Sequence, residues 1–361
     1  FFMKKCTLFL MISIIITCSA SGITRSNLDR PLMIGPQYPM MYFTTFFVPD
    51  SAFTLSEGDF FFQVTYLENN AFSYTSDALK YSNPDAPPGE FTGNSNEGYS
   101  VYLDAEISRR ILRTQVGISD GLELQFVFRD FKIGSGSWDS KIESFHESFQ
   151  LGNQNREFAE LDELHIYIRN NETGENEYVI TKNMKEYRKE SITLAFKMSV
   201  STSEDDALSL TIASNYGDYL LKELNEVKKE GESDHKNFDD YVLALNYSSI
   251  FENWSLHAAV SRAFIKNSFL ENTAKHIDYS FLGINWHIVQ DWDIMIQGLR
   301  YSSIYPSDSA SNIDFTIGEF TLGARAFITD ETAFEIGFVE NITQGAQNTD
   351  IAFFSSLLMT F

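Results

Sequence analysis

The sequence predicts an all-β protein, a transmembrane antiparallel up-and-down β-barrel of about fourteen strands. Three observations support this prediction. Beyond residue 58, apolar and polar residues alternate with a period of two, in stretches of about eight to twelve residues. Short and long connections alternate between these stretches, and the chain ends on an alternating segment that closes with Phe361. Outer-membrane barrels have short periplasmic turns and longer extracellular loops, whereas the alternative, a secreted all-β domain, has no reason to alternate its connection lengths.

The alternating segments follow one another along the chain, and each is predicted to form one strand. The segment 99–116 changes its apolar phase near Arg109 and Arg110, as a β-bulge would cause. The hairpin 162–182 could instead stand in a loop, which would leave twelve strands. In order, the expected strands cover residues 60–66, 99–116, 122–128, 164–168, 178–182, 192–200, 208–212, 241–247, 254–260, 282–288, 292–296, 320–326, 334–338 and 353–361.

The short connections mark one end of the predicted barrel. They fall near residues 118–121, 170–176, 202–205, 250–252, 289–291 and 329–330. Trp254 and Trp292 each begin a strand directly after a short turn, where an aromatic girdle at the periplasmic interface would place them.

The first residues are predicted to be removed from the mature protein. Two lysines precede an apolar run from Leu8 to Ile16, and small residues follow as far as Gly22, which is the layout of a secretory signal peptide over residues 1–22. A lipidated Cys18 is the alternative. Cys6 and Cys18 are the only cysteines of the sequence, so cleavage would leave no thiol for disulfide, metal or nucleophile chemistry.

Residues 23–57 contain four prolines, which oppose both helix and central strand. We expect this N-terminal extension to be either a plug inside the lumen or a mobile periplasmic leader, followed by the barrel at residues 58–361. An apolar plug would suit the inward face of the last strand, where Ala352, Phe354 and Leu358 are not polar.

Composition excludes two other classes of protein. With 27 Lys and Arg against 50 Asp and Glu, the net charge of -23 opposes a nucleic-acid partner. A hydrophobic content of 43% opposes disorder.

The alternation also predicts which side chains line the lumen, because ionisable groups avoid the lipid face. Both signs of charge occur among them, so strong ion selectivity is not expected. The lumen-lining candidates are Asp104, Glu106, Glu123, Arg129, His165, Arg169, Lys197, His257, His287, Asp293, Glu319, Arg325 and Glu335.

The last strand resembles the C-terminal signal that the outer-membrane assembly machinery reads. Phe353, Leu357, Met359 and Phe361 share one face of that strand, and Ser355 interrupts them. We therefore expect two partners, the outer-membrane lipids and the assembly machinery during biogenesis.

We expect no catalytic, cofactor or metal site. The sequence has no phosphate-binding Gly-Lys-Ser/Thr loop, no paired cysteines, no His-Glu-x-x-His and no Gly-x-Ser-x-Gly. His257 lies near Ser255 and Ser261, as in a barrel hydrolase, but no orienting group or oxyanion site accompanies it.

Two segments resemble an uncharacterised family of Gram-negative outer-membrane proteins. One runs from Phe145-His146-Glu147 through Gly152 to Arg156-Glu157, and the other is the closing segment Gly323 to Thr343. The family motif has Gly and Asp where this chain has Ser144 and Glu147, and its Pro is absent here. The resemblance implies a barrel and adds no chemistry.

These observations together predict a bacterial outer-membrane barrel that acts as a channel or transporter for small solutes. The predicted strand number and N-terminal extension also resemble the outer-membrane transporters of hydrophobic compounds. The alternative is a plugged structural or surface-interaction barrel that acts through its extracellular loops.

Overall fold

The computed structural model describes residues 27–361 except for 84, 93–97, 150–159, 218–225, 228–239, 267–272, 290, 306–314 and 344–346. The predicted signal peptide, residues 1–22, lies outside the described residues. Within the described ranges, no helix is both long enough and apolar enough to cross a membrane.

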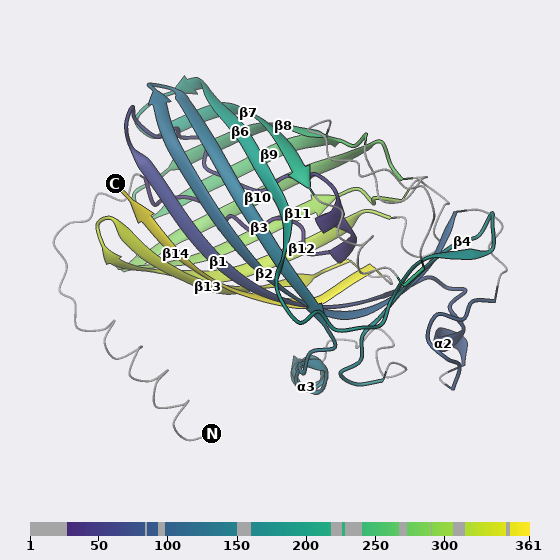
Figure 1. Cartoon of the computed structure of the whole chain (residues 1–361). Helices are drawn as coiled ribbons and strands as arrows, with labels where there is room; N and C mark the ends of the chain where they lie inside the picture. Colours follow the sequence, from purple (N-terminus) through teal and green to yellow (C-terminus); the bar gives the residue numbers. More distant parts are fainter. Residues whose placement is uncertain are drawn as a thin grey trace.

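Fourteen strands form one antiparallel sheet, as predicted (Figure 1). Twelve of them close into a barrel, because β1 pairs with both β2 and β14, and β3 pairs with β6. The strands are β1 (Phe60–Tyr74), β2 (Tyr99–Ser119), β3 (Leu122–Gly134), β4 (His165–Asn170), β5 (Glu175–Ile180), β6 (Arg188–Thr202), β7 (Asp206–Gly217), β8 (Tyr241–Ile250), β9 (Trp254–Phe264), β10 (His276–Val289), β11 (Trp292–Tyr301), β12 (Ile317–Thr329), β13 (Thr332–Asn341) and β14 (Gln347–Thr360).

The hairpin of β4 and β5 lies outside the barrel wall, although its alternation is like that of a wall strand. Besides its partner β5, β4 pairs with Tyr99–Asp104, the first residues of β2. Apolar residues of the hairpin, including Ile166 and Ile168, are buried in one cluster with Leu103 of β2. The hairpin therefore extends β2 beyond the wall on the side of the long connections, where α2 (Leu79–Ser82) and α3 (Asp139–Phe149) also lie (Figure 1).

The short connections of the wall are tight turns, as the sequence predicts. Their described residues are 120–121, 203–205, 251–253, 291 and 330–331. Gly121 has a φ of +82° in the first of them, a conformation that a side chain would strain. Trp254 and Trp292 begin β9 and β11 directly after such turns, and the Trp254 ring stacks on Phe251 with centroids 3.9 Å apart.

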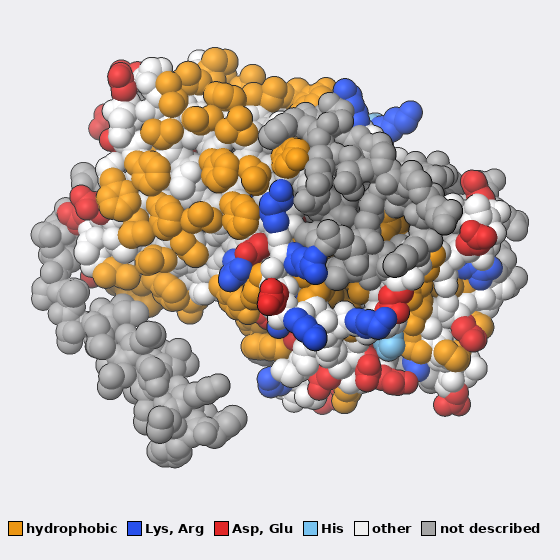
Figure 2. All heavy atoms as spheres, viewed as in Figure 1, with side chains coloured by type: hydrophobic (Ala, Val, Ile, Leu, Met, Phe, Trp, Pro, Cys, Tyr) orange, Lys and Arg blue, Asp and Glu red, His pale blue; other side chains and the backbone are white. Residues whose placement is uncertain are grey.

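The outer face of the wall is a continuous apolar surface. Figure 2 shows it as a broad band of hydrophobic side chains over the strands. Exposed apolar side chains also occur on strands around the wall, among them Val64 on β1, Phe196 on β6, Ile284 on β10 and Ile296 on β11. A water-soluble monomer rarely exposes so large an apolar surface, and a barrel that faces lipid requires one.

The pairing of β2 differs from the sequence prediction. The β1–β2 register runs without a shift from Phe60 opposite Val116 to Tyr74 opposite Tyr102, so no bulge interrupts β2 at Arg109. The apparent change of phase has another cause. Residues 99–107 are buried on both faces, because this end of β2 packs against neighbouring segments on its two sides, so apolar residues are tolerated on both.

Candidate functional site

The segment Asn27–Glu57 lies inside the barrel, and Figure 1 shows it in purple within the ring of strands. Its first arm follows β10 to β12, where Leu32 pairs with the side chain of Gln297 on β11. The chain turns at the 3-10 helix η1 (Pro39–Phe43). Its second arm returns along β2, β3 and β6 to β8, and leaves at the short-turn end, where Gly58 N donates to Gly117 O at 3.0 Å.

Wall side chains satisfy much of the segment's backbone. An irregular chain cannot pair its own amides and carbonyls, and burial without partners is costly. Wall acceptors therefore receive Leu32 N, Gln37 N, Ala52 N and Leu55 N. The acceptors are, in that order, Gln297 Oε1 at 2.6 Å, Glu319 Oε1 at 2.8 Å, Ser248 Oγ at 2.8 Å and Glu123 Oε2 at 3.1 Å.

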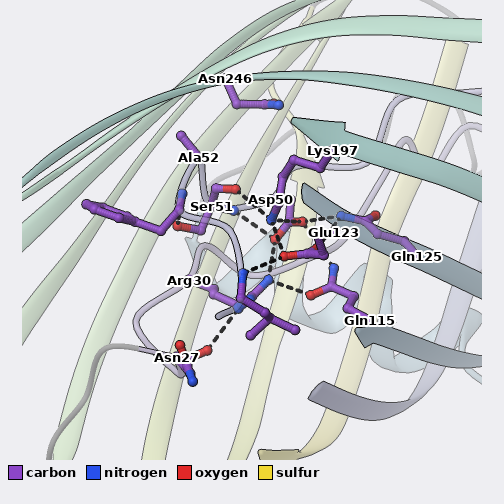
Figure 3. Close-up of polar contacts among 12 residues, drawn as sticks. Asn27, Arg30, Asp50, Ser51, Ala52, Gln115, Glu123, Gln125, Lys197 and Asn246 are labelled. Carbon is purple, nitrogen blue, oxygen red and sulfur yellow. Dashed lines mark hydrogen bonds and ion pairs between the residues drawn. The ribbon is translucent and has the colours of Figure 1, made fainter. Parts of the chain in front are cut away.

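Asp50 is the centre of a buried ionic cluster between the segment and the wall (Figure 3). Its Oδ1 accepts from Arg30 Nη1 at 2.9 Å, and its Oδ2 accepts from Lys197 Nζ at 3.1 Å. Lys197 Nζ also lies 3.1 Å from Glu123 Oε2. Arg30 and Asp50 belong to the segment, and Lys197 and Glu123 to β6 and β3, so the four charges balance across the interface.

The environment of Asp50 favours its charged form. Burial by itself would raise the pKa of this carboxyl, but the charges of Lys197, Arg30 and Arg113 outweigh burial and lower the pKa below its ordinary value. Two wall amides, Gln115 Nε2 at 3.1 Å and Gln125 Nε2 at 2.8 Å, also donate to Oδ2.

A second polar cluster surrounds Asp29 in the first arm. Its Oδ1 accepts from Ser255 Oγ at 2.7 Å and Asn285 Nδ2 at 2.9 Å, and lies 3.9 Å from His257 Nε2. Burial would raise the pKa of Asp29, but hydrogen bonding and charge from His257 lower it. His257 Nδ1 lies 2.8 Å from Ser248 Oγ. All these side chains are buried, so the serine and histidine groups join segment to wall and face no open site.

Two wall arginines hold the remainder of the segment. Arg325 donates to Leu28 O at 2.6 Å and to Arg30 O at 2.7 Å, and is paired with Glu335 at 2.6 Å. Arg109, nearer the long-connection end, makes a two-pronged ion pair with Glu190 and lies over the ring of Tyr42 at 3.7 Å.

Tyr38 lies at the start of η1, near the long-connection end of the lumen. Its hydroxyl is 3.4 Å from that of Tyr305, and burial raises the pKa of Tyr38 to about 12.

Apolar contacts fill the side of the lumen next to the last strand. Leu32 and Ile34 pack in one cluster with Ala352 and Phe354, and Leu28, Met33 and Leu55 pack in another with Leu358. The inward residues of β14 that are not polar therefore face apolar residues of the segment. Their outward neighbours Phe353, Leu357 and Phe361, which the sequence assigns to the assembly signal together with Met359, are exposed on the lipid side.

Most of the predicted lumen-lining residues face the lumen. Several contact the N-terminal segment directly or pair with residues that do. The residues on this face are Glu123, Arg129, Lys197, His257, His287, Asp293, Glu319, Arg325 and Glu335.

Four predicted lumen residues lie elsewhere. Asp104 and Glu106 are on the opposite face of β2 from Arg109, because the uninterrupted β1–β2 register leaves no bulge to change their side. Glu106 there accepts from Ser137 N at 2.8 Å. His165 and Arg169 belong to β4, outside the wall, where they are opposite Asp104 and Ser100.

Sequence reasoning missed Arg109, Arg113 and Gln115, which face the lumen from β2. Arg109 and Arg113 are four residues apart and Arg113 and Gln115 are two apart, which puts all three on one face of a regular strand. The bulge expected near Arg109 obscured this pattern. Sequence reasoning also missed Asp29, Arg30 and Asp50, since no periodicity marks an irregular segment.

Three carboxylates outside the lumen lie close together. Oxygens of Glu106, Asp139 and Asp162 are within 4.8 Å of one another, and a hard cation takes such ligands. Asn70 Nδ2 already donates to Asp139 at 2.7 Å, and Asp162 N donates to the other oxygen of Asp139 at 2.6 Å.

A closed antiparallel barrel with an apolar outer face and a polar interior is the architecture of outer-membrane barrel proteins. The chain belongs to the family described as "Protein of unknown function (DUF3187)", whose model matches residues 8–361. This confirms the prediction of membership in an uncharacterised family. Part of the motif segment that suggested it, residues 150–159, lies outside the described residues. No curated protein matches the chain in sequence.

The chain is also similar to solved structures, among them a toluene transporter and a porin. The toluene transporter TodX of P. putida is 8% identical, with a TM-score of 0.40 over 85% of this chain and 89% of that chain. The NanC porin is 9% identical, with a TM-score of 0.40 over 82% and 98%. A Pseudomonas aeruginosa FadL homologue is 10% identical, with a TM-score of 0.39 over 84% and 90%.

Proposed function

We propose that the protein is a Gram-negative outer-membrane channel or transporter for small solutes, and that the segment Asn27–Glu57 is a plug that must move for a solute to pass. The plug occupies the lumen between the wall strands, so passage and plug position are coupled. The turns at the short-connection end would face the periplasm, and the signal peptide would direct the chain there.

The observation that carries the proposal is the chemistry of the interface between plug and wall. Along β3, β6 and β8 the plug is held by ion pairs such as Asp50 to Lys197 and by wall side chains that bind its backbone. Water can replace each of these partners. A core meant only to fill the barrel would be at least as stable with apolar residues in place of buried ion pairs. The polar interface therefore suits a plug that leaves and returns.

A cross-link tests the movement directly. Ala52 N donates to Ser248 Oγ at 2.8 Å, so cysteines at these two positions would lie close enough for a disulfide between plug and wall. The native cysteines, Cys6 and Cys18, belong to the predicted signal peptide, so the mature chain offers no competing thiol. We expect the refolded Ala52→Cys/Ser248→Cys barrel to conduct in a planar bilayer after reduction and to fall silent after oxidation.

The single variants Ala52→Cys and Ser248→Cys, treated with the same oxidant, are the controls. A chain lacking residues 23–57 should conduct without gating. Equal conductance of the oxidised and reduced double variant would refute a moving plug, and silence of every folded form would refute the channel.

A second function is favoured by the hairpin of β4 and β5. Val101, Ile168 and Ile180 of this hairpin and of the start of β2 are buried in one apolar cluster that continues into η1 and the barrel wall. Such a built surface suits a protein that interacts through its external face. Two results together would favour this function: no folded form conducts in a planar bilayer, and binding through the external face of the barrel is lost when residues 165–180 are deleted.

A further inference from the structure

Between the second arm of the plug and the wall lies a cavity of about 50 Å³. The plug contributes Phe46, Phe47 and Asp50 to it, and the wall contributes Arg113 of β2 and Arg129 of β3. Both guanidinium groups come from lumen-facing positions of adjacent strands and are buried. The cavity is therefore lined by two arginines of the wall and by aromatic rings of the plug.

The charges of Asp50 and Glu190 act on these two arginines only through space, because both carboxylates are bound to other cations. No described carboxylate forms an ion pair with either, and Arg113 Nε is buried without a hydrogen-bond partner. Arg129 Nη1 donates only to hydroxyls, at 2.6 Å from Thr193 Oγ1 and 3.4 Å from Ser191 Oγ, and its guanidinium lies 4.9 Å from the ring centroid of Phe46.

The nearby carboxylates are already engaged. Asp50 accepts from five donors, among them Arg30 and Lys197. Glu123 is paired with Lys197, and Glu190 with Arg109. The ion pairs on this side of the lumen therefore join Arg30 and Lys197 to Asp50 and Glu123, and Arg109 to Glu190, which leaves Arg113 and Arg129 outside every described ion pair. Buried charges are ordinarily paired, because an uncompensated ion loses its hydration without return.

From this geometry we infer that the cavity binds a small organic carboxylate, whose charge the guanidinium groups of Arg113 and Arg129 compensate. A carboxylate matches the planar guanidinium fork, which favours two parallel hydrogen bonds. Val127 and Val242 line the cavity beside the rings of Phe46 and Phe47 and would contact an apolar portion of the ligand. Asn246 also lines it, and its buried Oδ1 has no partner, so it could accept from a ligand hydroxyl.

That the cavity binds a carboxylate does not depend on the proposed function. That this carboxylate is the transported solute rests on the proposed function. The ligand would sit between plug and wall, in contact with both. Binding there would link the presence of the solute to the position of the plug.

The test is equilibrium dialysis of the full mature chain in detergent micelles against radiolabelled lactate, a small carboxylate with one hydroxyl. We expect saturable binding of about one lactate per barrel, weakened at least tenfold by Arg113→Gln. Arg110→Gln is the matched control, since Arg110 is the next arginine of β2, is exposed, and pairs with Asp130 on the outer face. Its lactate affinity should be unchanged.

Arg129→Lys provides a second variant that keeps the charge and loses the fork, and it should also weaken binding. Lactate should raise the thermal midpoint of the native chain and not that of Arg113→Gln. Absence of saturable binding, equal binding by Arg113→Gln, or equal displacement by chloride at the same concentration would each overturn the inference. Conductance plays no part in this assay, so a failure here and a failure of the channel proposal are separate results.

Discussion

Replacing Asp50 by Asn should release the plug from the wall. The carboxylate is 8% exposed and pairs with Arg30 at 2.9 Å and with Lys197 at 3.1 Å. The cluster of Arg30, Asp50, Lys197 and Glu123 is neutral, and the substitution leaves it with one uncompensated positive charge. Removing one partner of a buried ion pair typically costs about 3–5 kcal/mol. Because about 1.4 kcal/mol is a factor of ten, the undocked population should rise between about a hundredfold and several thousandfold.

A single cysteine at Thr45, which is buried in the same arm, reports this population. Cleavage of the predicted signal peptide would leave the introduced cysteine as the sole thiol. The rate of maleimide labelling of the Thr45→Cys variant then follows the population with an open plug, provided that the plug recloses faster than the cysteine is labelled. Adding Asp50→Asn should accelerate labelling at least a hundredfold.

The charge-balanced variant Arg30→Met/Asp50→Asn separates charge from packing. It returns the cluster to neutrality with the pair of Lys197 and Glu123 intact, so it should label more slowly than Asp50→Asn alone. Asp278→Asn is the control, because Asp278 pairs with Arg262 in solvent, where an ion pair contributes about 0–1 kcal/mol. A rise of less than threefold for Asp50→Asn, or equal rates for the single and double variants, would refute the reasoning.

Three further predictions concern pH, the lipid face and assembly. Asp29 and Asp50 have lowered pKa values in the folded state, so their stabilisation of the docked plug is complete above the ordinary pKa of 3.8 and is lost as the pH falls through the lower folded pKa values. Channel openings should therefore become more frequent below about pH 4. An unchanged opening frequency between about pH 6 and pH 2 would contradict this prediction. Ile284→Arg places a charge on the lipid face and should destabilise the barrel by about 2–4 kcal/mol in urea unfolding from vesicles, whereas Ile284→Leu should not. Phe361→Ala should lower the yield of folded barrel in cells while refolding in vitro stays near normal, since the side chain is 68% exposed; equal losses in both assays would indicate a structural role.

The local pattern of the sequence was sufficient for the class of fold and for the lipid face. Side chains of a strand alternate between its two faces, so the polarity of each residue shows its side once the register is regular. In the strands predicted at 192–200, 282–288 and 292–296, the alternation puts Phe196, Ile284 and Ile296 outward, and it puts Lys197 and Arg325 inward. Turn lengths were readable for the same reason, because a break in alternation marks the end of a strand.

Several features required the tertiary structure. The alternation of residues 165–180 is that of a wall strand, and only the pairing of β3 with β6 leaves that hairpin outside the barrel. The inward orientation of Arg109 and Arg113 depends on the register between β1 and β2. The pattern of polar and apolar residues does not show this register, because residues 99–107 of β2 are buried on both faces of the strand.

The barrel, its outward apolar face and its polar interior can be predicted from the amino-acid sequence alone, because they follow from residues two positions apart on one strand. What fills that interior depends on contacts between distant parts of the chain. Asp50 meets Lys197, and Arg30 meets Gln115, across long separations in the chain. An irregular segment with four prolines has no periodicity from which its partners could be read. Its position is determined by the wall side chains that satisfy its backbone and charges, and these come together only when the barrel closes.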